Sequence, residues 1–338
     1  MKTQTRAKAI HERYKRETSK GPLRTSAQEN EVKAQHFVQK AYLEGFCDTP
    51  PSQKSDTPML WVHSADGRWR QNPVNCAVEK YFYCHDPGDG SRSFLGETFL
   101  SDLENASMEV LKAAQQGQLP TCRKDRFTLT GYVAMALVRT QAAKKLMDKA
   151  AIDMTVQGIR DLVNDPVRLA EYCAEQEKET GKREDPDEVR QVLQAGRVRA
   201  TQTSRSWSLK TMATQMMYFQ NMFMRMNLVM VRAHNAQFAT SDCPVKVANP
   251  ATIPILPKGM VSWEMVFPLS RQHCLAGTYS ELSHPFMDVD ESQVKYCNIQ
   301  LARHANRLVY SPVEADYIQT ELKSASTQRD AGSNVIQF

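Results

Sequence analysis

The chain has 338 residues, 41% of them hydrophobic and 24% charged, and its 43 Lys and Arg against 38 Asp and Glu give a net charge of +5. This is the composition of a globular protein long enough to bury a sizeable core. There is no window of about 18 uncharged apolar residues and no signal-peptide core near the start, which argues against a membrane-spanning or secreted chain and predicts a cytoplasmic one.

The positive charge is concentrated at the N-terminus. Nine Lys and Arg but only four Asp and Glu lie in residues 1–33, so the rest of the chain is balanced. We therefore expect residues 1–30 to form a basic, flexible arm, in which residues 3–19 could form a charged helix. Such a segment can bind the phosphates of a nucleic acid, and the alternative is a solvated arm that only aids solubility. The candidate nucleic-acid-binding residues are Arg6, Lys8, Arg13, Lys15, Arg16 and Lys40.

The eight cysteines are scattered. They include no Cys-x-x-Cys pair and no Cys/His spacing typical of zinc sites, which favours reduced thiols in a cytosol. No metal site is predicted and no cofactor is identified, although the use of a divalent ion stays open.

The elements of the first half are predicted from apolar spacing. Residues 31–46 have helical spacing, and MLWVH, a turn at Ala65-Asp66-Gly67 and RWRQNPV predict a β-hairpin. Apolar residues three and four apart predict helices over 95–116 and 126–148. Residues 174–206 are highly charged and predict a surface excursion with one short helix.

In the second half, residues 206–234 predict the most apolar helix, which carries seven methionines. A methionine-rich face can bind partners, but at helical spacing it usually fills the core, and we interpret it as core. Three β-prone runs follow, AQFATSD, EMVFPLS and QHCLAGTY, then a helix over 289–305, the strand RLVYS and a last helix from Val313 to about Ser324. Together these elements predict an α+β fold, mainly helical with a small, mostly antiparallel sheet. We expect a single large domain over 31–324 and a disordered tail over 325–338.

Several segments, in order, resemble the signature blocks of the family catalogued as domain of unknown function 4238, found in bacteria and their viruses. The blocks are QHFVQKAYLEGF, AVEKYFY, LSDLENASMEVL, YVAMALVRT, FATSDCPV, FPLS, YCNIQ and ANRLVYSP. The first block has Gln35, Gln39 and Lys40 where the family has a histidine, a proline and a glutamine, while His36 matches the second histidine. The resemblance covers about residues 31–322 and implies a common fold without implying an activity.

Five residues are candidates for catalysis. Asp242 precedes Cys243-Pro244 at the end of a predicted strand, where it could act as a general base or instead cap backbone N–H groups. His36 suits proton transfer at neutral pH, or it could be a hydrogen-bonded core histidine. Glu104 and Arg139 lie on neighbouring predicted helices and could form an ion pair that fixes them, and Asn298 could make scaffolding hydrogen bonds.

These residue types allow two hypotheses. The first is a hydrolase acting on nucleic acid, and more specifically a ribonuclease or toxin-like effector of a bacterial defence system, with His36 and Asp242 as base and acid and Arg139 or Lys40 stabilising charge. The second is a non-catalytic binding or regulatory subunit, in which the basic arm or the methionine-rich helix contacts a partner. A homo-oligomer is compatible with either hypothesis.

Overall fold

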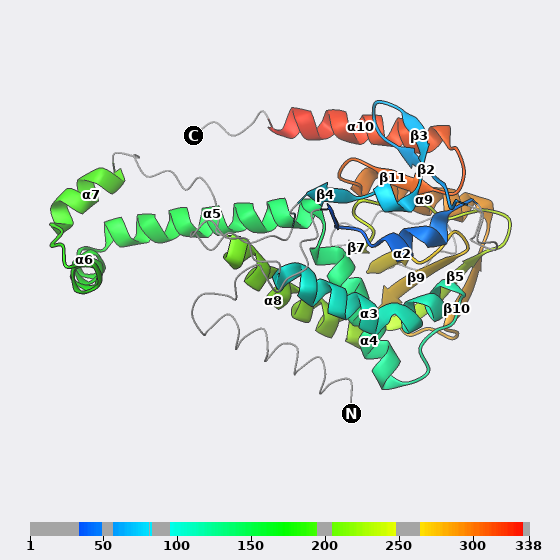
Figure 1. The fold of residues 1–338 in the computed structure, drawn as a ribbon, viewed down its shortest axis with the longest axis horizontal. Coiled ribbons are helices and arrows are strands. Elements are labelled where there is room, and N and C mark those ends of the chain that lie inside the picture. Colours follow the sequence, from blue (N-terminus) through cyan, green and yellow to red (C-terminus); the bar gives the residue numbers. More distant parts are fainter. Residues whose placement is uncertain are drawn as a thin grey trace.

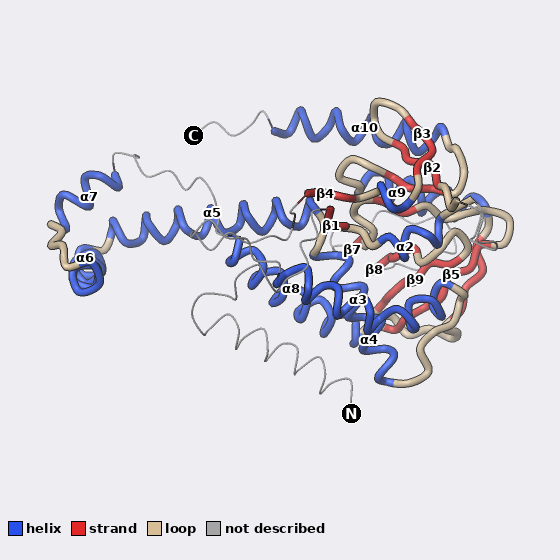
Figure 2. The backbone as a smooth tube through the Cα atoms, in the orientation of Figure 1, coloured by secondary structure: helices blue, strands red, loops and turns tan. Residues whose placement is uncertain are grey.

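The computed structural model describes residues 34–48, 57–80, 82, 95–194, 205–247 and 264–333. The sheets and most helices lie together at one end of the molecule, and helix α5 (Gln141–Asn164) projects away from them (Figures 1 and 2). The basic arm, with its predicted helix and its five candidate residues from Arg6 to Arg16, lies outside the described residues. None of the helices in the described ranges is both long and apolar enough to cross a membrane.

The expected single small sheet is wrong, because the structure has three sheets of two, five and four strands. The five-stranded sheet has the order β10 (Phe286–Val289), β5 (Asn227–Ala233), β9 (His273–Thr278), β8 (Met265–Pro268) and β7 (Lys246–Val247). It is mixed, since β10 pairs with β5 in parallel and the other pairs are antiparallel. The sequence revealed the β-prone runs but not their pairing, which depends on tertiary contacts.

The four-stranded sheet is antiparallel, in the order β3 (Arg68–Gln71), β2 (Leu60–His63), β11 (Val309–Ser311) and β6 (Thr240–Ser241). It contains the predicted hairpin β2–β3 and the predicted strand RLVYS, which are confirmed. Its edge strand β6 comes from the AQFATSD run, so the three β-prone runs divide between two sheets rather than joining one.

The two-stranded sheet replaces part of an expected helix. Residues Ala34–His36 form strand β1, paired antiparallel with β4 (Val78–Lys80), and only Lys40–Leu43 (α2) and Glu44–Phe46 (a 3₁₀ turn) are helical. A second 3₁₀ turn, Pro73–Asn75, precedes β4. The helical prediction was wrong for residues 34–36, because pairing with a strand more than 40 positions away decides the conformation there and local spacing does not report it. Residues 31–33 lie outside the described part of the chain.

Two expected helices have different bounds. The predicted helix over 126–148 is two helices, α4 (Arg123–Val138) and α5, because Thr140 leaves the helical conformation and its hydroxyl accepts a hydrogen bond from the N–H of Ala143 as an N-cap. The methionine-rich helix α8 ends at Arg225, and the apolar run that follows forms β5. Because that run is buried on both faces, its sequence shows no alternation of apolar and polar residues, and a helix cannot be distinguished from a strand by periodicity.

The remaining helices surround the sheets or form the projection. Helix α3 (Leu95–Gln115) packs on α4, which also packs on α8, and α9 (Glu291–His304) packs on α10 (Asp316–Ser333). The predicted helix over 289–305 is therefore confirmed, while the last helix continues to Ser333, past its expected end near Ser324. The described part of the charged excursion contains the end of α6 (Pro166–Thr180) and all of α7 (Pro186–Gln194), so it holds more than the one short helix expected.

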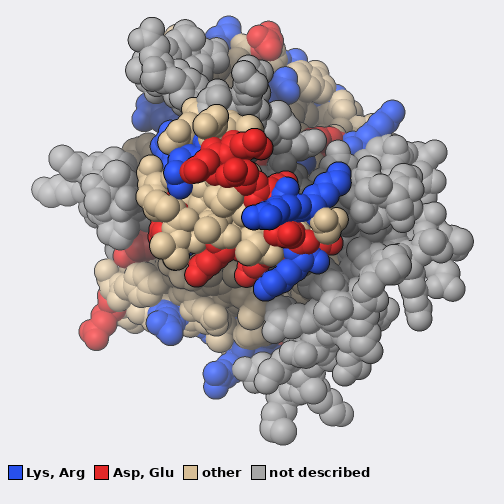
Figure 3. All heavy atoms as spheres, turned by 90° about the vertical axis from the view of Figure 1, so that its left-hand side faces the viewer, with Lys and Arg blue, Asp and Glu red and all other residues tan. Residues whose placement is uncertain are grey.

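The projection formed by α5, α6 and α7 has little core of its own. Among its described side chains only Leu169 and Cys173 are buried, whereas Leu146 and Met154 are 69% and 70% exposed. Its tip carries acidic and basic side chains intermixed around a patch of other residues (Figure 3).

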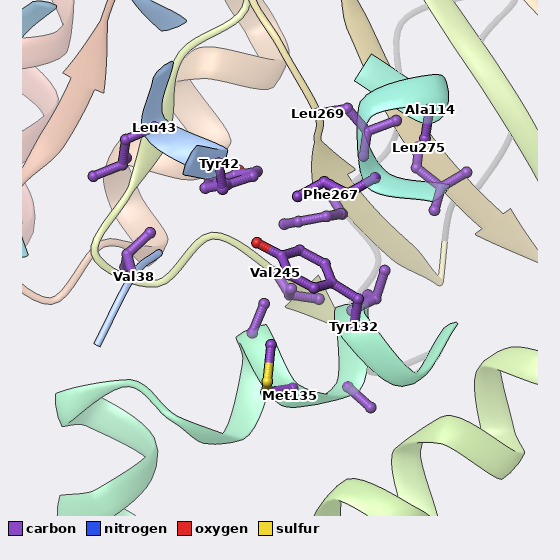
Figure 4. Close-up of a cluster of buried hydrophobic side chains, with 14 of the residues drawn as sticks. Val38, Tyr42, Leu43, Ala114, Tyr132, Met135, Val245, Phe267, Leu269 and Leu275 are labelled. Atoms are coloured by element: carbon purple, nitrogen blue, oxygen red, sulfur yellow. The ribbon is translucent and has the colours of Figure 1, made fainter. Parts of the chain in front are cut away.

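The main core lies between α2, α4 and the five-stranded sheet. The rings of Tyr42 and Phe267 stack with their centroids 5.0 Å apart, and Tyr132 packs against Phe267 from the opposite side (Figure 4). The Tyr42 hydroxyl donates to the carbonyl of Pro268 at 2.6 Å and accepts from the hydroxyl of Thr240 at 2.6 Å. On α8, Met212 and Met216 are buried and Met217 is exposed, so the methionines serve mainly as core, as interpreted from the sequence.

Candidate functional site

His36 is the last residue of β1, and its side chain is half-buried beside the 3₁₀ turn that precedes β4. Its Nε2 lies 3.1 Å from the carbonyl oxygen of Val74. A carbonyl can only accept, so Nε2 carries the proton and Nδ1 keeps its lone pair. Nδ1 has no hydrogen-bond partner among the residues that the structure describes, which leaves it able to accept a proton.

Arg139 connects strand β1 to helices α3 and α4. It is the C-cap residue of α4, and its buried guanidinium donates one hydrogen bond to the carboxylate of Glu104 on α3 and another to the main-chain carbonyl of His36. A buried guanidinium is tolerated only when it is paired in this way. The structure therefore brings together three of the five predicted catalytic residues, His36, Glu104 and Arg139.

The groups around His36 determine the protonation state of its imidazole. Burial lowers the pKa of the imidazole below its ordinary value, and the positive charges of Arg139 and Lys40 lower it further, while the hydrogen bond to Val74 and the charge of Glu104 oppose the shift. His36 is accordingly neutral at neutral pH, the form in which a histidine can act as a general base.

Two further polar residues border the site, and neither was among the candidate site residues predicted from the sequence. The Tyr132 hydroxyl donates to Oε1 of Gln39 at 2.6 Å, and both side chains are buried. Burial, followed by the negative charge of Glu104, raises the pKa of Tyr132, so the phenol stays protonated. Tyr132 stands among apolar residues in the run YVAMALVRT, where the sequence gives no sign of what its hydroxyl contacts. Gln39 was visible in the sequence as a departure from the family block.

Asp242 does not join this group through its carboxylate. Oδ1 accepts from the N–H of Asn306 at 2.8 Å, and Oδ2 accepts from the N–H groups of Arg307 and Leu308 at 2.8 and 3.1 Å. The side chain is 3% exposed. Its contacts are those of a cap on the turn between α9 and β11, the alternative recognised in the sequence.

Asn298 has similar scaffolding contacts. Its Oδ1 accepts from the N–H of Ala239 at 2.8 Å, and its Nδ2 donates to the carbonyl of Gln237 and the hydroxyl of Tyr317, both at 3.0 Å. The amide thus joins α9 to the chain before β6 and to α10. It is buried, and these contacts leave it no evident role on a substrate.

Lys40 is the one candidate nucleic-acid-binding residue within the described ranges. It is exposed and lies 3.5 Å from the Glu44 carboxylate, one helical turn further along. Exposed pairs of this kind contribute little free energy, so the ammonium remains available to an anion. Over the described ranges, no group of three or more His, Cys, Asp and Glu side chains is arranged to hold a metal ion.

Comparison with protein families gave one match. The family model described as protein of unknown function (DUF4238) matches residues 34–313, which include all of the site residues described above. Comparisons with curated proteins and with solved structures found no match.

Proposed function

This chain belongs to the DUF4238 family of proteins of unknown function, and we propose that it is a hydrolase acting on nucleic acid, with His36 as its proton-transfer residue. The observation that supports this proposal most directly is the state of His36. Nε2 is held by Val74, Nδ1 has no hydrogen-bond partner within the described ranges, and the main chain is fixed by Arg139. Burial lowers the pKa of the ring, which favours its neutral form. A fixed, neutral and partly accessible imidazole is the arrangement that general base catalysis requires.

RNA is the substrate that suits a single base of this kind. His36 Nδ1 would take the proton of a 2′-hydroxyl, the 2′-oxygen would bond to phosphorus, and the bond from phosphorus to the 5′-oxygen would break. Water would give a proton to that oxygen, and the hydroxide that remains would take the proton from His36. The products are a 2′,3′-cyclic phosphate and a 5′-hydroxyl, and His36 is neutral again. The exposed ammonium of Lys40 would stabilise the phosphate charge.

The other polar residues have supporting roles in this proposal. Arg139 and Glu104 act as positioning residues. Their charged groups bond to each other, and the Arg139 guanidinium also bonds to the main-chain carbonyl of His36. Asp242 and Asn298 stabilise the fold. The basic residues of the N-terminal segment would add affinity for phosphates. A toxin-like role in bacterial defence would follow from RNA cleavage inside a cell, and induced expression should then arrest growth.

The proposal is tested by incubating the protein with RNA and with single- and double-stranded DNA, with magnesium and with a chelator. We expect cleavage of RNA alone, in both conditions, with cyclic phosphate ends. His36→Ala should abolish it, whereas substitution of the exposed His284 by Ala should not. An intact substrate in every lane, or full activity in His36→Ala, would reject the assignment.

A non-catalytic binding or regulatory subunit is the second candidate, and two observations favour it. The functional groups of Asp242 and Asn298 are used on the protein itself. In addition, Met217 and the next residue, Tyr218, are both exposed on α8. Under this alternative His36→Ala should lower the melting temperature and change no activity, and Tyr218→Ala should weaken capture of a partner without affecting stability.

A further inference from the structure

Helix α5 carries an apolar stripe on its outward face. Leu146, Ala150 and Met154 are spaced four residues apart, so they lie on one side of the helix over about 12 Å of its length. All three are exposed, and Leu146 and Met154 are 69% and 70% so. A stripe with two large apolar side chains this exposed, on a helix that projects from the body (Figure 1), is typical of a surface that packs on another protein.

The stripe is symmetric in its own sequence. Ala150 lies midway between Leu146 and Met154, so an antiparallel copy of the helix would place Ala150 against Ala150 and each Leu146 against the Met154 of the other copy. The small central side chain would let the helices approach closely, and the long outer ones would fill the space on either side. An interface in which the same patch meets itself is the ordinary form of a twofold dimer.

The charges beside the stripe have nearly the same symmetry, since their midpoint is one position from Ala150, or about 1.5 Å along the helix. Lys149 and Asp153 are exposed, flank the stripe on one side and are also four residues apart. In an antiparallel pair each edge of a helix faces the same edge of its partner. Lys149 of each copy would therefore lie beside Asp153 of the other, which gives two equivalent ion pairs. A parallel arrangement would not produce this pairing, so the charges favour an antiparallel one.

From the exposed stripe and its flanking charges we propose that the chain forms a homodimer through antiparallel packing of α5 on α5, with the twofold axis at Ala150. The two bodies would then lie on opposite sides of a central helix pair. The occupant of this surface is a second copy of the chain rather than an unrelated partner, because both the apolar residues and the charges complement themselves.

The test is the molar mass in solution, measured by sedimentation velocity up to about 100 μM, where complexes of micromolar Kd are populated. We expect twice the 38.4 kDa chain mass at high concentration. Ala150→Glu, which places two carboxylates on the axis, should give a monomer, and Thr155→Glu, an exposed position on the other side of the same helix, should not. A monomer at every concentration, or a dimer that survives Ala150→Glu, would overturn the proposal.

Charge reversal separates the proposed pairing from loss of folding. Lys149→Glu and Asp153→Lys should each raise the dissociation constant about tenfold, because each places like charges opposite each other. The double variant should regain most of the affinity. Failure of the double variant to recover, with each variant shown to be folded by circular dichroism, would reject the antiparallel register.

A disulfide reports the axis directly. Ala150→Cys should form a cross-linked dimer on oxidation, since symmetry brings the two thiols together, and Thr155→Cys should not exceed the background set by the parent chain's own cysteines. Equal cross-linking of the two variants would contradict an axis at Ala150.

Discussion

Arg139 donates a hydrogen bond to the main-chain carbonyl of His36, a residue 103 positions earlier in the chain. The same guanidinium pairs with Glu104, so one side chain fixes the end of β1 relative to α3 and α4. The candidate base thus depends on a buried cation for its position, and the ion pair and the site should fail together.

Removal of this cation should be costly. Arg139→Ala leaves the partly buried Glu104 carboxylate and the His36 carbonyl without their donor, and we expect the free energy of unfolding to fall by about 3 kcal/mol. Arg139→Met combined with Glu104→Leu should lose less than Arg139→Ala alone, because no unpaired charge remains. Urea denaturation of Arg139→Met, Glu104→Leu and the double variant measures the coupling. A double variant that loses the sum of the two single losses would mean that the pair contributes nothing.

Asp242 should affect stability and not chemistry. Asp242→Asn keeps the shape of the side chain but replaces one carboxylate oxygen with an amide that cannot accept from the N–H groups of the turn. We expect a loss of about 2 kcal/mol in the free energy of unfolding, with any RNA cleavage unchanged under conditions where the variant is folded. The exposed Asp102→Asn on α3 is the control and should be neutral. Loss of cleavage in a folded Asp242→Asn protein would restore Asp242 to the active site.

The sequence was most informative where structure is determined locally. The hairpin β2–β3 follows from alternating residues around a turn, and helix α9 has a capping box in which Asp290 and Gln293 bond reciprocally. It was least informative where the conformation of a segment depends on residues far away in the sequence. β1 is a strand because of β4, and β5 is buried on both faces, so neither shows the pattern of its own structure.

For the candidate site, the sequence indicated which residues to select but not how they lie in space. His36, Glu104 and Arg139 could be selected by residue type, because a buried ion pair and a histidine are unusual on apolar segments. Their convergence depends on tertiary contacts and could not be predicted. The pairing of Tyr132 with Gln39 was missed because a tyrosine on an apolar helix face gives no sign of what its hydroxyl contacts.

The stability of the protein should depend on pH through His63. This histidine is fully buried in β2, with Nε2 2.8 Å from Oγ of Ser311, and burial lowers its pKa to about 4. An unfolded histidine titrates near pH 6.5. As the pH falls below that value the unfolded chain binds a proton that folded His63 does not accept until about pH 4. The free energy of unfolding should therefore fall across this window, by up to about 3 kcal/mol.

Urea denaturation at several pH values between 7.5 and 4 measures this slope. His63→Gln should be less stable at pH 7.5 and show a shallower slope, since the titrating group is gone. Substitution of the exposed His284 by Gln should leave the slope unchanged. The burial of His36 and His273 lowers their pKa values in the same direction, so a smaller slope should persist in His63→Gln. An identical slope in His63→Gln and the parent would show that His63 is not the group responsible.

Gly117, after the end of α3, should tolerate no side chain. It has a φ of +85°, and a Cβ there would lie 2.5 Å from Nε2 of His273. That imidazole cannot turn away freely, because its Nδ1 donates to the carbonyl of Gln115 at 2.9 Å. Gly181, after α6, has a similar φ of +70° but open space around it. Gly181→Ala should therefore cost about 1 kcal/mol of backbone strain, and Gly117→Ala should cost about 3 kcal/mol because an overpacking penalty is added.

Combining Gly117→Ala with His273→Ala separates the two contributions. If the clash is the larger one, the double variant should be more stable than the sum of the single losses predicts, since the new methyl group then occupies the space that the imidazole leaves. Thermal denaturation of the four proteins gives this coupling. Strict additivity would mean that the strained φ alone accounts for the requirement for glycine, and that the contact between α3 and the β8–β9 turn adapts to a side chain.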